Sequence, residues 1–393
     1  MSRLEELIQE LCPDGVRHIA LEKVCNISKG IQFNKSGMHD EGSYPVINGG
    51  INPSGYIEQY NQDENTITIS QGGASAGYVN WLTVKFWAGA HCYIIKPTEA
   101  VLNRYVYHFI KSQEYRLQEC QYGAGIPALA KTTVSALAMP LPPLPVQSEI
   151  VRILDTFTEL TAELTAELTA RKKQYSAYLN ILIDRSRFSN PSVMKLGELF
   201  DFRNGLSKDK KFFGKGTPFI RYTDVYNNRV LHKEDISALV ECTPPELEKL
   251  KISRGDVLFT RTSETAEDVG WSSVMLDDIG DCVFNGFTIR ATPKADHLLP
   301  EYCAYCFSTN EFRQYVISHC AFTTRASLTG KTIAEYEIAV PSIAEQQKIV
   351  NILDKLYLLC NSLSSGLPAE IAARQKQYEF YRDKLLSFKE LNV

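Results

Sequence analysis

The residues that could carry chemistry in this chain complete no catalytic motif. The stretch "SLTGKT" (327–332) ends like a phosphate-binding loop, but Arg325 stands where that motif requires its first glycine. The single C-x-x-C motif "CAYC" (303–306) has no second pair, so it does not predict a zinc site. The Asn/Asp-Pro-Pro-Tyr/Phe signature of amino-methyltransferases is missing from the sequence. We therefore expect no catalytic residue, no metal site and no cofactor in this chain.

Side chains suited to nucleic-acid contact are more frequent. The stretch "KDKKFFGKG" (208–216) places lysines beside two phenylalanines, and "FTRTSETAEDVG" (259–270) places an arginine, a threonine and a serine after an expected strand. These residue types can reach phosphates or base edges, although each stretch is equally typical of a solvated loop. The candidate DNA-contacting residues are Gln71, Ser75, Lys131, Lys208, Lys210, Lys211, Lys215, Arg221, Arg261, Thr262, Ser263, Arg325 and Lys331.

The composition is that of a soluble globular protein. Of 393 residues, 44% are hydrophobic and 22% are charged, and this length favours two or three domains. A membrane span requires an apolar run of about 18 residues, and the sequence contains none. We also find no apolar signal segment at the N-terminus. Ten irregularly spaced cysteines are typical of reduced thiols, so a cytoplasmic location is expected. With a net charge of −4, any nucleic-acid surface must be local or shared with partners.

The chain contains two copies of one unit. The segment "VQSEIVRILD" (146–155) matches "EQQKIVNILD" (345–354), and "RKKQY" (171–175) matches "RQKQY" (374–378). Further segments upstream match in the same order, which chance matches would not maintain. Each copy is therefore expected to be a globular part followed by a helix.

The globular parts have the pattern of mixed α/β domains. Short β-rich runs such as "CYIIKP" (92–97) and "GDVLFTR" (255–261) lie between turn-forming residues, and the periodic segments 104–119 and 301–317 predict helices. The predicted fold class is α+β, with two mixed α/β domains in tandem and two long helices that pair as an antiparallel coiled coil. The expected boundaries are 1–145 for the first domain, 146–187 for the central helix, 188–340 for the second domain and 341–393 for the C-terminal helical region.

The helical regions carry a 4-3-4-3 spacing of apolar residues, which is the pattern of a coiled-coil seam. "SSGLPAE" (364–370) interrupts the second region, because Gly366 and Pro368 should end one helix and start another. The predicted seam residues are Ile150, Leu154, Phe157, Leu164, Leu168, Tyr175, Tyr178, Leu182, Ile349, Leu353, Leu356, Leu363, Tyr378, Tyr381 and Leu385.

The tetrapeptide Thr-Ala-Glu-Leu occurs twice in the first helical region, at 161–164 and 165–168. One copy adds about one turn, or roughly 6 Å, to a helix. A repeat of this kind indicates that the length of the helix matters, and the candidate explanation is that it sets the separation of two globular parts. The alternative is an ordinary interdomain coiled coil whose length has no such role.

The chain resembles the specificity subunit of type I restriction–modification enzymes over essentially its full length. "YPVINGGINPSGY" (44–56) is similar to one target recognition domain of that family, and "TPFIRYTDV" (217–225) with "GDVLFTRTS" (255–263) is similar to the second. The two helical regions resemble its conserved repeats. The Thr-Ala-Glu-Leu copies resemble the subgroup in which the number of repeats varies.

The resemblance implies that each globular domain reads one half of a bipartite DNA site, the first domain the 5′ half. It also implies that the paired helices set the unspecified spacer and dock two methyltransferase subunits, which methylate adenine. Two motor–nuclease subunits would complete the complex. S-adenosylmethionine, ATP and Mg are expected on those partners and not on this chain, and no membrane is involved.

Two other functions compete with this interpretation. A non-catalytic coiled-coil adaptor that binds proteins and not DNA would have the same duplicated architecture. A self-contained restriction or modification enzyme is disfavoured, because the motifs for methyl transfer and phosphate binding are missing.

Overall fold

The computed structural model describes residues 2–123, 125, 127–188 and 192–391. It divides into two compact units. Unit 1 comprises Met1–Ala166 and Ala369–Val393, and unit 2 comprises Glu167–Pro368. The predicted second domain, 188–340, includes residues 189–191, which lie outside the described part of the chain. Each unit therefore contains one globular part and stretches of both helical regions.

Unit 1 is built on a four-stranded sheet in the order β2-β8-β5-β6 and a three-stranded sheet in the order β4-β3-β7. A short pair, β1 with β9, joins the beginning and the end of the globular part. The strands are β1 (His18–Ala20), β2 (Cys25–Lys29), β3 (Tyr44–Ile47), β4 (Tyr56–Ile57), β5 (Thr66–Ser70), β6 (Val79–Leu82), β7 (Trp87–Ala88), β8 (Cys92–Pro97) and β9 (Ala138–Pro140). The helices of the globular part are α1 (Arg3–Leu11), α2 (Asn103–Ser112), α3 (Glu114–Glu119) and α4 (Lys131–Ser135).

Unit 2 repeats this arrangement with an additional strand and a small third sheet. Its main sheet has the order β11-β19-β15-β17-β13, and the smaller sheets have the orders β14-β12-β18 and β16-β21-β20. The strands are β10 (Ser192–Lys195), β11 (Phe200–Asn204), β12 (Phe213–Ile220), β13 (Val230–Leu231), β14 (Ala238–Val240), β15 (Val257–Thr260), β16 (Thr262–Ser263), β17 (Ser272–Met275), β18 (Val283–Phe284), β19 (Thr288–Pro293), β20 (Ala321–Phe322), β21 (Ala326–Ser327) and β22 (Glu337–Val340). The helices of the globular part are α6 (Leu196–Leu199), α7 (Tyr222–Asn227), α8 (Pro244–Leu250), α9 (Pro300–Cys306), α10 (Asn310–His319) and α11 (Gly330–Ala334).

The two main sheets have the same register. Cys25 of β2 pairs with Pro97 of β8, and Phe200 of β11 pairs with Pro293 of β19. The central strand β5 is buried along its whole length, and so is β15, whose Val257 and Phe259 pack into one hydrophobic core and whose Leu258 packs into another. The periodic segments 104–119 and 301–317 are each divided into two helices, α2 with α3 and α9 with α10, where the prediction had one. The internal repeat of the sequence is thus a repeat of topology and of strand pairing.

The long helices begin and end at residues that explain their limits. α5 runs over Leu144–Ile183, with Pro145 in its first turn, a position that tolerates proline. α12 (Ile343–Asn361) and α13 (Leu367–Leu385) are separated at Gly366, as predicted. A Cβ at Gly366 would lie 2.6 Å from the carbonyl oxygen of Leu358, so only glycine allows this close approach. Among the described residues, none of these helices is apolar enough to cross a membrane.

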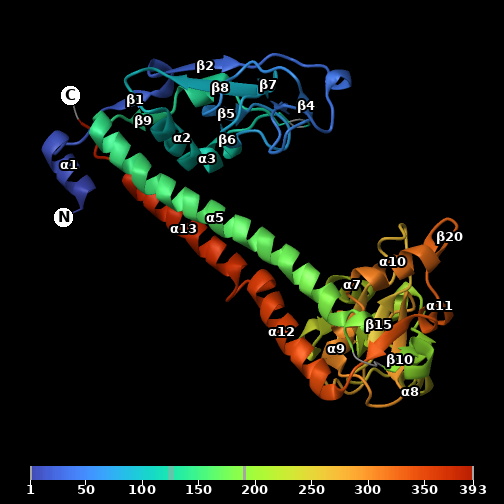
Figure 1. Ribbon diagram of the computed structural model, residues 1–393. Helices are drawn as coiled ribbons and strands as arrows, with labels where there is room; N and C mark the ends of the chain where they lie inside the picture. The colour runs from blue at the N-terminus through green and yellow to red at the C-terminus, as the bar shows by residue number, and fades with distance from the viewer. Residues whose placement is uncertain (1, 124, 126, 189–191, 392–393) are drawn as a thin grey trace. The chain divides into compact units, whose positions relative to one another are not determined.

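The helices pair within each unit. In unit 1, α13 runs alongside the first part of α5 in the opposite direction (Figure 1), and the ring of Phe157 stacks on Tyr381 at 5.3 Å between centroids. In unit 2, Tyr175 of α5 contacts Tyr357 of α12 edge-on at 5.9 Å. Both pairs join residues of different repeats. Helix α5, which follows the first globular part, therefore ends in unit 2, and α13, which follows the second, ends in unit 1.

Two predicted seam residues differ from the structure. Tyr178 is 41% exposed and Leu179 is buried in its place, because this end of α5 packs into the core of unit 2. Leu363 is 87% exposed, since α12 ends at Asn361 and the seam does not continue past the helix. The buried seam residues are Ile150, Leu154, Leu182, Ile349, Leu353 and Tyr378, and those of intermediate exposure are Phe157, Leu164, Leu168, Tyr175, Leu356 and Leu385. Tyr381 is 40% exposed but stacks on Phe157.

A partly buried polar cluster, which we call the unit 1 node, joins α2 to both long helices of unit 1. Asp155 of α5 accepts hydrogen bonds from Arg104 Nε at 2.7 Å and from His108 Nε2 at 2.9 Å. Burial lowers the pKa of His108, so the ring is neutral, and its Nδ1 accepts from the Tyr378 hydroxyl of α13 at 3.0 Å. Burial alone would raise the pKa of Asp155, but the hydrogen bonds from His108 and Arg104 outweigh it and hold the pKa below its usual value.

Unit 2 has an equivalent cluster, the unit 2 node. Tyr305 occupies the place of His108 and donates a hydrogen bond to Asp354, the counterpart of Asp155. The guanidinium of Arg229 lies 3.8 Å from Asp354 and stacks over the ring of Tyr305 at 4.0 Å. Each node therefore fixes a carboxylate at the same position of the repeated helix, with different side chains around it.

Candidate nucleic-acid interface

In unit 2, the turns that follow three strands meet at one end of the globular part. Arg261, directly after β15, has its carbonyl bonded to Leu328 N at 2.8 Å, and β16 pairs Thr262 with Ser327. The amide of Arg261 donates to the carbonyl of Phe287 at 2.8 Å. Asn285, beside it, donates to Ile220, the residue before Arg221. We call residues 221, 261–263, 285–287 and 321–327 the unit 2 loop end.

Unit 1 has the same hydrogen bonds at the equivalent place. The carbonyl of Gln71, directly after β5, accepts from Leu129 N at 2.7 Å, and its amide donates to the carbonyl of His91 at 2.9 Å. Gly89 donates to Ile47, the residue before Asn48. We call residues 48–49, 71–75, 89–91, 122–123 and 127–128 the unit 1 loop end. Ser75 lies in the turn that leads from Gln71 to β6.

The two loop ends present different side chains on this shared frame. Unit 2 exposes Phe287 and Phe322, with 57% and 60% of their surfaces in solvent, next to the exposed Arg325. Unit 1 exposes His91 and Tyr122. Exposed aromatic rings beside cations and amides are residue types that contact nucleic acid.

A packed aromatic cluster supports the unit 2 loop end. The ring of Tyr222 stacks on Tyr226 at 5.9 Å, and the Tyr226 hydroxyl donates to Asp268 at 2.7 Å. Hydrogen bonds from Tyr226 and Thr265 lower the pKa of Asp268, which therefore carries a charge within the loop. The turn after Arg261 is thus fixed by contacts of its own.

Three of the predicted cations are engaged within unit 2. Lys208 donates to Glu246 at 2.7 Å, and this contact is the main reason why the pKa of Glu246 falls to about 2. Lys215 lies 3.1 Å from a carboxylate oxygen of Glu241. Arg221 binds Asp224 through two of its nitrogens, although its side chain is half exposed. Lys210 and Lys211 lie exposed on a short 3₁₀ turn of the same region.

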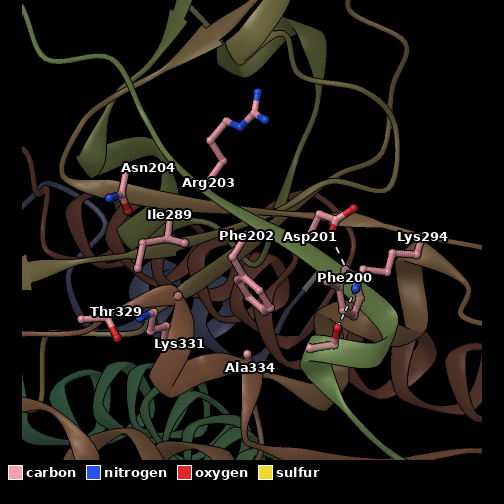
Figure 2. Close-up of a pocket in the computed structure, with 12 residues that line it drawn as sticks. Phe200, Asp201, Phe202, Arg203, Asn204, Ile289, Lys294, Thr329, Lys331 and Ala334 are labelled. Atoms are coloured by element: carbon pink, nitrogen blue, oxygen red, sulfur yellow. Dashed lines mark hydrogen bonds and ion pairs between the residues drawn. The ribbon is translucent and has the colours of Figure 1, made fainter.

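The remaining two predicted lysines line equivalent grooves. In unit 2, a groove of about 550 Å³ runs between β11 and α11 (Figure 2), with Lys331 and Thr329 at one end and Asp201 and Lys294 at the other. In unit 1, a groove of about 400 Å³ between β2 and α4 contains Lys131. No pattern in the sequence predicted these grooves. Thr98 of the unit 1 groove and Lys294 of the unit 2 groove occupy equivalent positions. Each follows a proline that pairs with the first residue of the neighbouring strand, Pro97 with Cys25 and Pro293 with Phe200.

The two loop ends therefore bring polar, cationic and aromatic side chains together. The described part of the chain has no group of three or more His, Cys, Asp or Glu side chains placed to hold a metal ion. Of the thirteen candidate residues, the structure brings five together at the unit 2 loop end and two at the unit 1 loop end. They are Arg221, Arg261, Thr262, Ser263 and Arg325 in unit 2, and Gln71 and Ser75 in unit 1. Sequence inspection missed His91 and Phe287, whose backbone carbonyls accept hydrogen bonds from the amides of Gln71 and Arg261.

A duplicated mixed α/β domain with a loop end on each copy, combined with long helices, describes a class of tandem recognition proteins. The family model for the type I restriction modification DNA specificity domain matches residues 13–171 and 189–373, one match for each repeat. The chain therefore belongs to the family of type I restriction–modification specificity subunits, as the sequence predicted. This assignment does not support the alternative of an adaptor that binds only proteins.

Similar proteins agree with this assignment. A protein of Haemophilus influenzae named as a type I restriction enzyme specificity subunit is 29% identical, over 94% of both chains. The EcoR124I/EcoR124II specificity subunit of Escherichia coli is 32% identical, over 62% of this chain and 60% of its own length. The solved S subunit of a type I restriction-modification system from M. genitalium has a TM-score of 0.56 at 18% identity. The match covers 94% of this chain and 96% of that one. A second solved structure, described in connection with complex assembly and conformational transition of the type I R-M system, has a TM-score of 0.64 at 16% identity. The match covers 96% of this chain and 98% of that one. At these identities the two structures show the shared fold.

Proposed function

We propose that the chain reads a bipartite DNA sequence, with one half-site at each loop end. The observation that carries this proposal is the shared frame of hydrogen bonds, which presents Gln71 and His91 in unit 1 but Arg261 and Phe287 in unit 2. Base edges are distinguished by their pattern of hydrogen-bond donors and acceptors, so two different half-sites need different side chains. The two loop ends present different side chains on the same backbone frame. The loop ends are where we expect base contacts.

Phosphate contacts belong to the flanking cations in this proposal. Lys131 and Lys331 line the two grooves, and Lys210 and Lys211 are exposed. Such contacts supply affinity without sequence preference. Lys208 has a structural role, because Glu246 and the carbonyl of Glu241 already occupy its ammonium group.

The long helices set the spacer and dock methyltransferase subunits. Large apolar side chains remain exposed on them, including Ile181, Leu358 and Phe380, with 57–62% of their surfaces in solvent. Exposed apolar side chains in such number on helices favour a protein partner. The partners carry S-adenosylmethionine and methylate adenine, and two motor–nuclease subunits with ATP and Mg complete the complex in the cytoplasm. The chain itself contributes recognition and no catalysis.

A map of N6-methyladenine in the genome of cells that express this chain with its cognate methyltransferase tests the proposal. We expect a split motif with a constant gap, which disappears when the gene for this chain is deleted. A continuous motif would show that one loop end is silent. Methylation that persists without the chain would overturn the proposal.

A further inference from the structure

Gln71 and Arg261 occupy equivalent positions in the two units. Each is the first residue after the central strand of its sheet, β5 or β15. Each has its backbone held on both sides, by the carbonyl of His91 or Phe287 and by the amide of Leu129 or Leu328, at 2.7–2.9 Å. The backbone from which each side chain extends is therefore fixed.

The two side chains are nevertheless uncommitted. Both are of intermediate exposure. Within the described ranges, neither the amide of Gln71 nor the guanidinium of Arg261 has a hydrogen-bond or ion-pair partner, whereas Arg221 nearby is bound to Asp224. Because both side chains are partly exposed and engage no other side chain in the described ranges, they are available to a partner from outside the chain.

The space next to Gln71 is open. A Cβ at Gly73, whose φ is +80°, would meet no atom within 4 Å, and a Cβ at Gly72 would meet only the carbonyl of Pro127 at 3.6 Å. Glycines of this kind allow another molecule to approach the backbone closely. In unit 2 the equivalent residues are Thr262 and Ser263, which can donate and accept hydrogen bonds themselves.

We propose that Gln71 and Arg261 are specificity-determining residues that read one base pair each. A glutamine amide pairs with N6 and N7 of adenine, and an arginine guanidinium pairs with O6 and N7 of guanine, each through two hydrogen bonds in the major groove. Gln71 therefore selects an adenine in the half-site of unit 1, and Arg261 selects a guanine in the half-site of unit 2. This inference rests on the proposed function, because it assigns bases within the same two half-sites.

The test compares methylation motifs of the complex formed with the wild-type chain and with Gln71→Arg, Gln71→Ala, Arg261→Gln and Arg261→Ala. We expect Gln71→Arg to replace one adenine by guanine in one half-site, and Arg261→Gln to replace one guanine by adenine in the other. The alanine variants should relax the same positions to all four bases. The gap and the untouched half-site should stay the same in every variant. Arg254→Gln, which removes a charge before β15 at its opposite end, is the matched control and should leave the motif unchanged.

A second measurement covers variants that methylate too weakly to map. The purified complex is titrated with duplexes in which each position of the wild-type motif is replaced in turn. Loss of one bidentate pair should reduce discrimination at a single position by roughly 10-fold to 100-fold. An equal loss of affinity on every duplex would indicate a phosphate contact and overturn the inference. So would unchanged half-sites in the substituted chains, or changes by both residues in one half-site. A wild-type motif that is not split would instead refute the proposed function.

Discussion

Replacing Asp155 by asparagine should loosen unit 1 by about 2 kcal/mol. The carboxylate accepts from Arg104 at 2.7 Å and from His108 at 2.9 Å, and the substitution removes the negative charge from both hydrogen bonds, while Arg104 keeps its own charge. Each hydrogen bond loses about 1 kcal/mol, since hydrogen bonds to a carboxylate are stronger than hydrogen bonds to a neutral amide oxygen. About 2 kcal/mol corresponds to a roughly 30-fold shift in an opening equilibrium.

Hydrogen–deuterium exchange of the full-length chain measures this loss locally, because protected amides report the opening of the segment that contains them. Amides of α2 should exchange roughly 30-fold faster in Asp155→Asn, while those of α9 should be unaffected. The control is Asp354→Asn, the same change in the unit 2 node, which should give the opposite pattern. Unchanged protection of α2, or equal losses in both helices, would refute the assignment of the node.

The same node makes unit 1 sensitive to acid. Because the pKa of His108 is lowered in the folded chain, the unfolded chain binds the proton more readily. The stability of unit 1 is therefore complete above the ordinary histidine pKa of about 6.5 and falls as the pH drops below it. Asp155 adds a further loss only in stronger acid, since its pKa is also lowered. Tyr305 replaces the histidine in unit 2, and burial raises the pKa of that tyrosine. After correction for intrinsic exchange rates, α2 should lose protection between pH 7 and 5 and α9 should not. Equal losses in the two helices would contradict this reasoning.

Three further predictions concern the helix and the loops. Deleting Thr161–Leu164 shortens α5 by roughly 6 Å and should shorten the gap of the methylation motif while leaving both half-sites unchanged; altered half-sites would count against a spacer role. Lys208→Met should raise the pKa of Glu246 from about 2 toward its ordinary value, as followed by carboxyl NMR, without changing the salt dependence of DNA binding; a reduced salt dependence would instead place Lys208 on a phosphate. Gly270→Ala should destabilise unit 2 by about 1–3 kcal/mol in thermal unfolding, because its φ is +71° and the new Cβ would lie 2.6 Å from Val316 Cγ1; an unchanged melting temperature would show that the turn adapts.

The amino-acid sequence by itself determined the features that depend on neighbouring residues. The strands "CYIIKP" and "GDVLFTR", the long helix and its interrupted counterpart follow from local spacing of apolar, glycine and proline residues, and the duplication follows from matching segments in the two halves of the chain. Family membership followed from the same segments. The spacing patterns involve residues that are close together in the chain, so they can be recognised without a structure.

Tertiary structure decided which polar side chains are available. Lys208 and Arg261 look alike in the sequence as basic residues in loops, but Glu246, 38 residues away, binds Lys208, while the side chain of Arg261 has no partner in the described ranges. The His108–Tyr378 contact joins residues 270 positions apart. Likewise, Leu179 and not Tyr178 is buried, because a core assembled from distant strands meets that face of α5. Such pairings are set by strand register and helix packing over long separations, where the spacing of residues along the chain carries no signal.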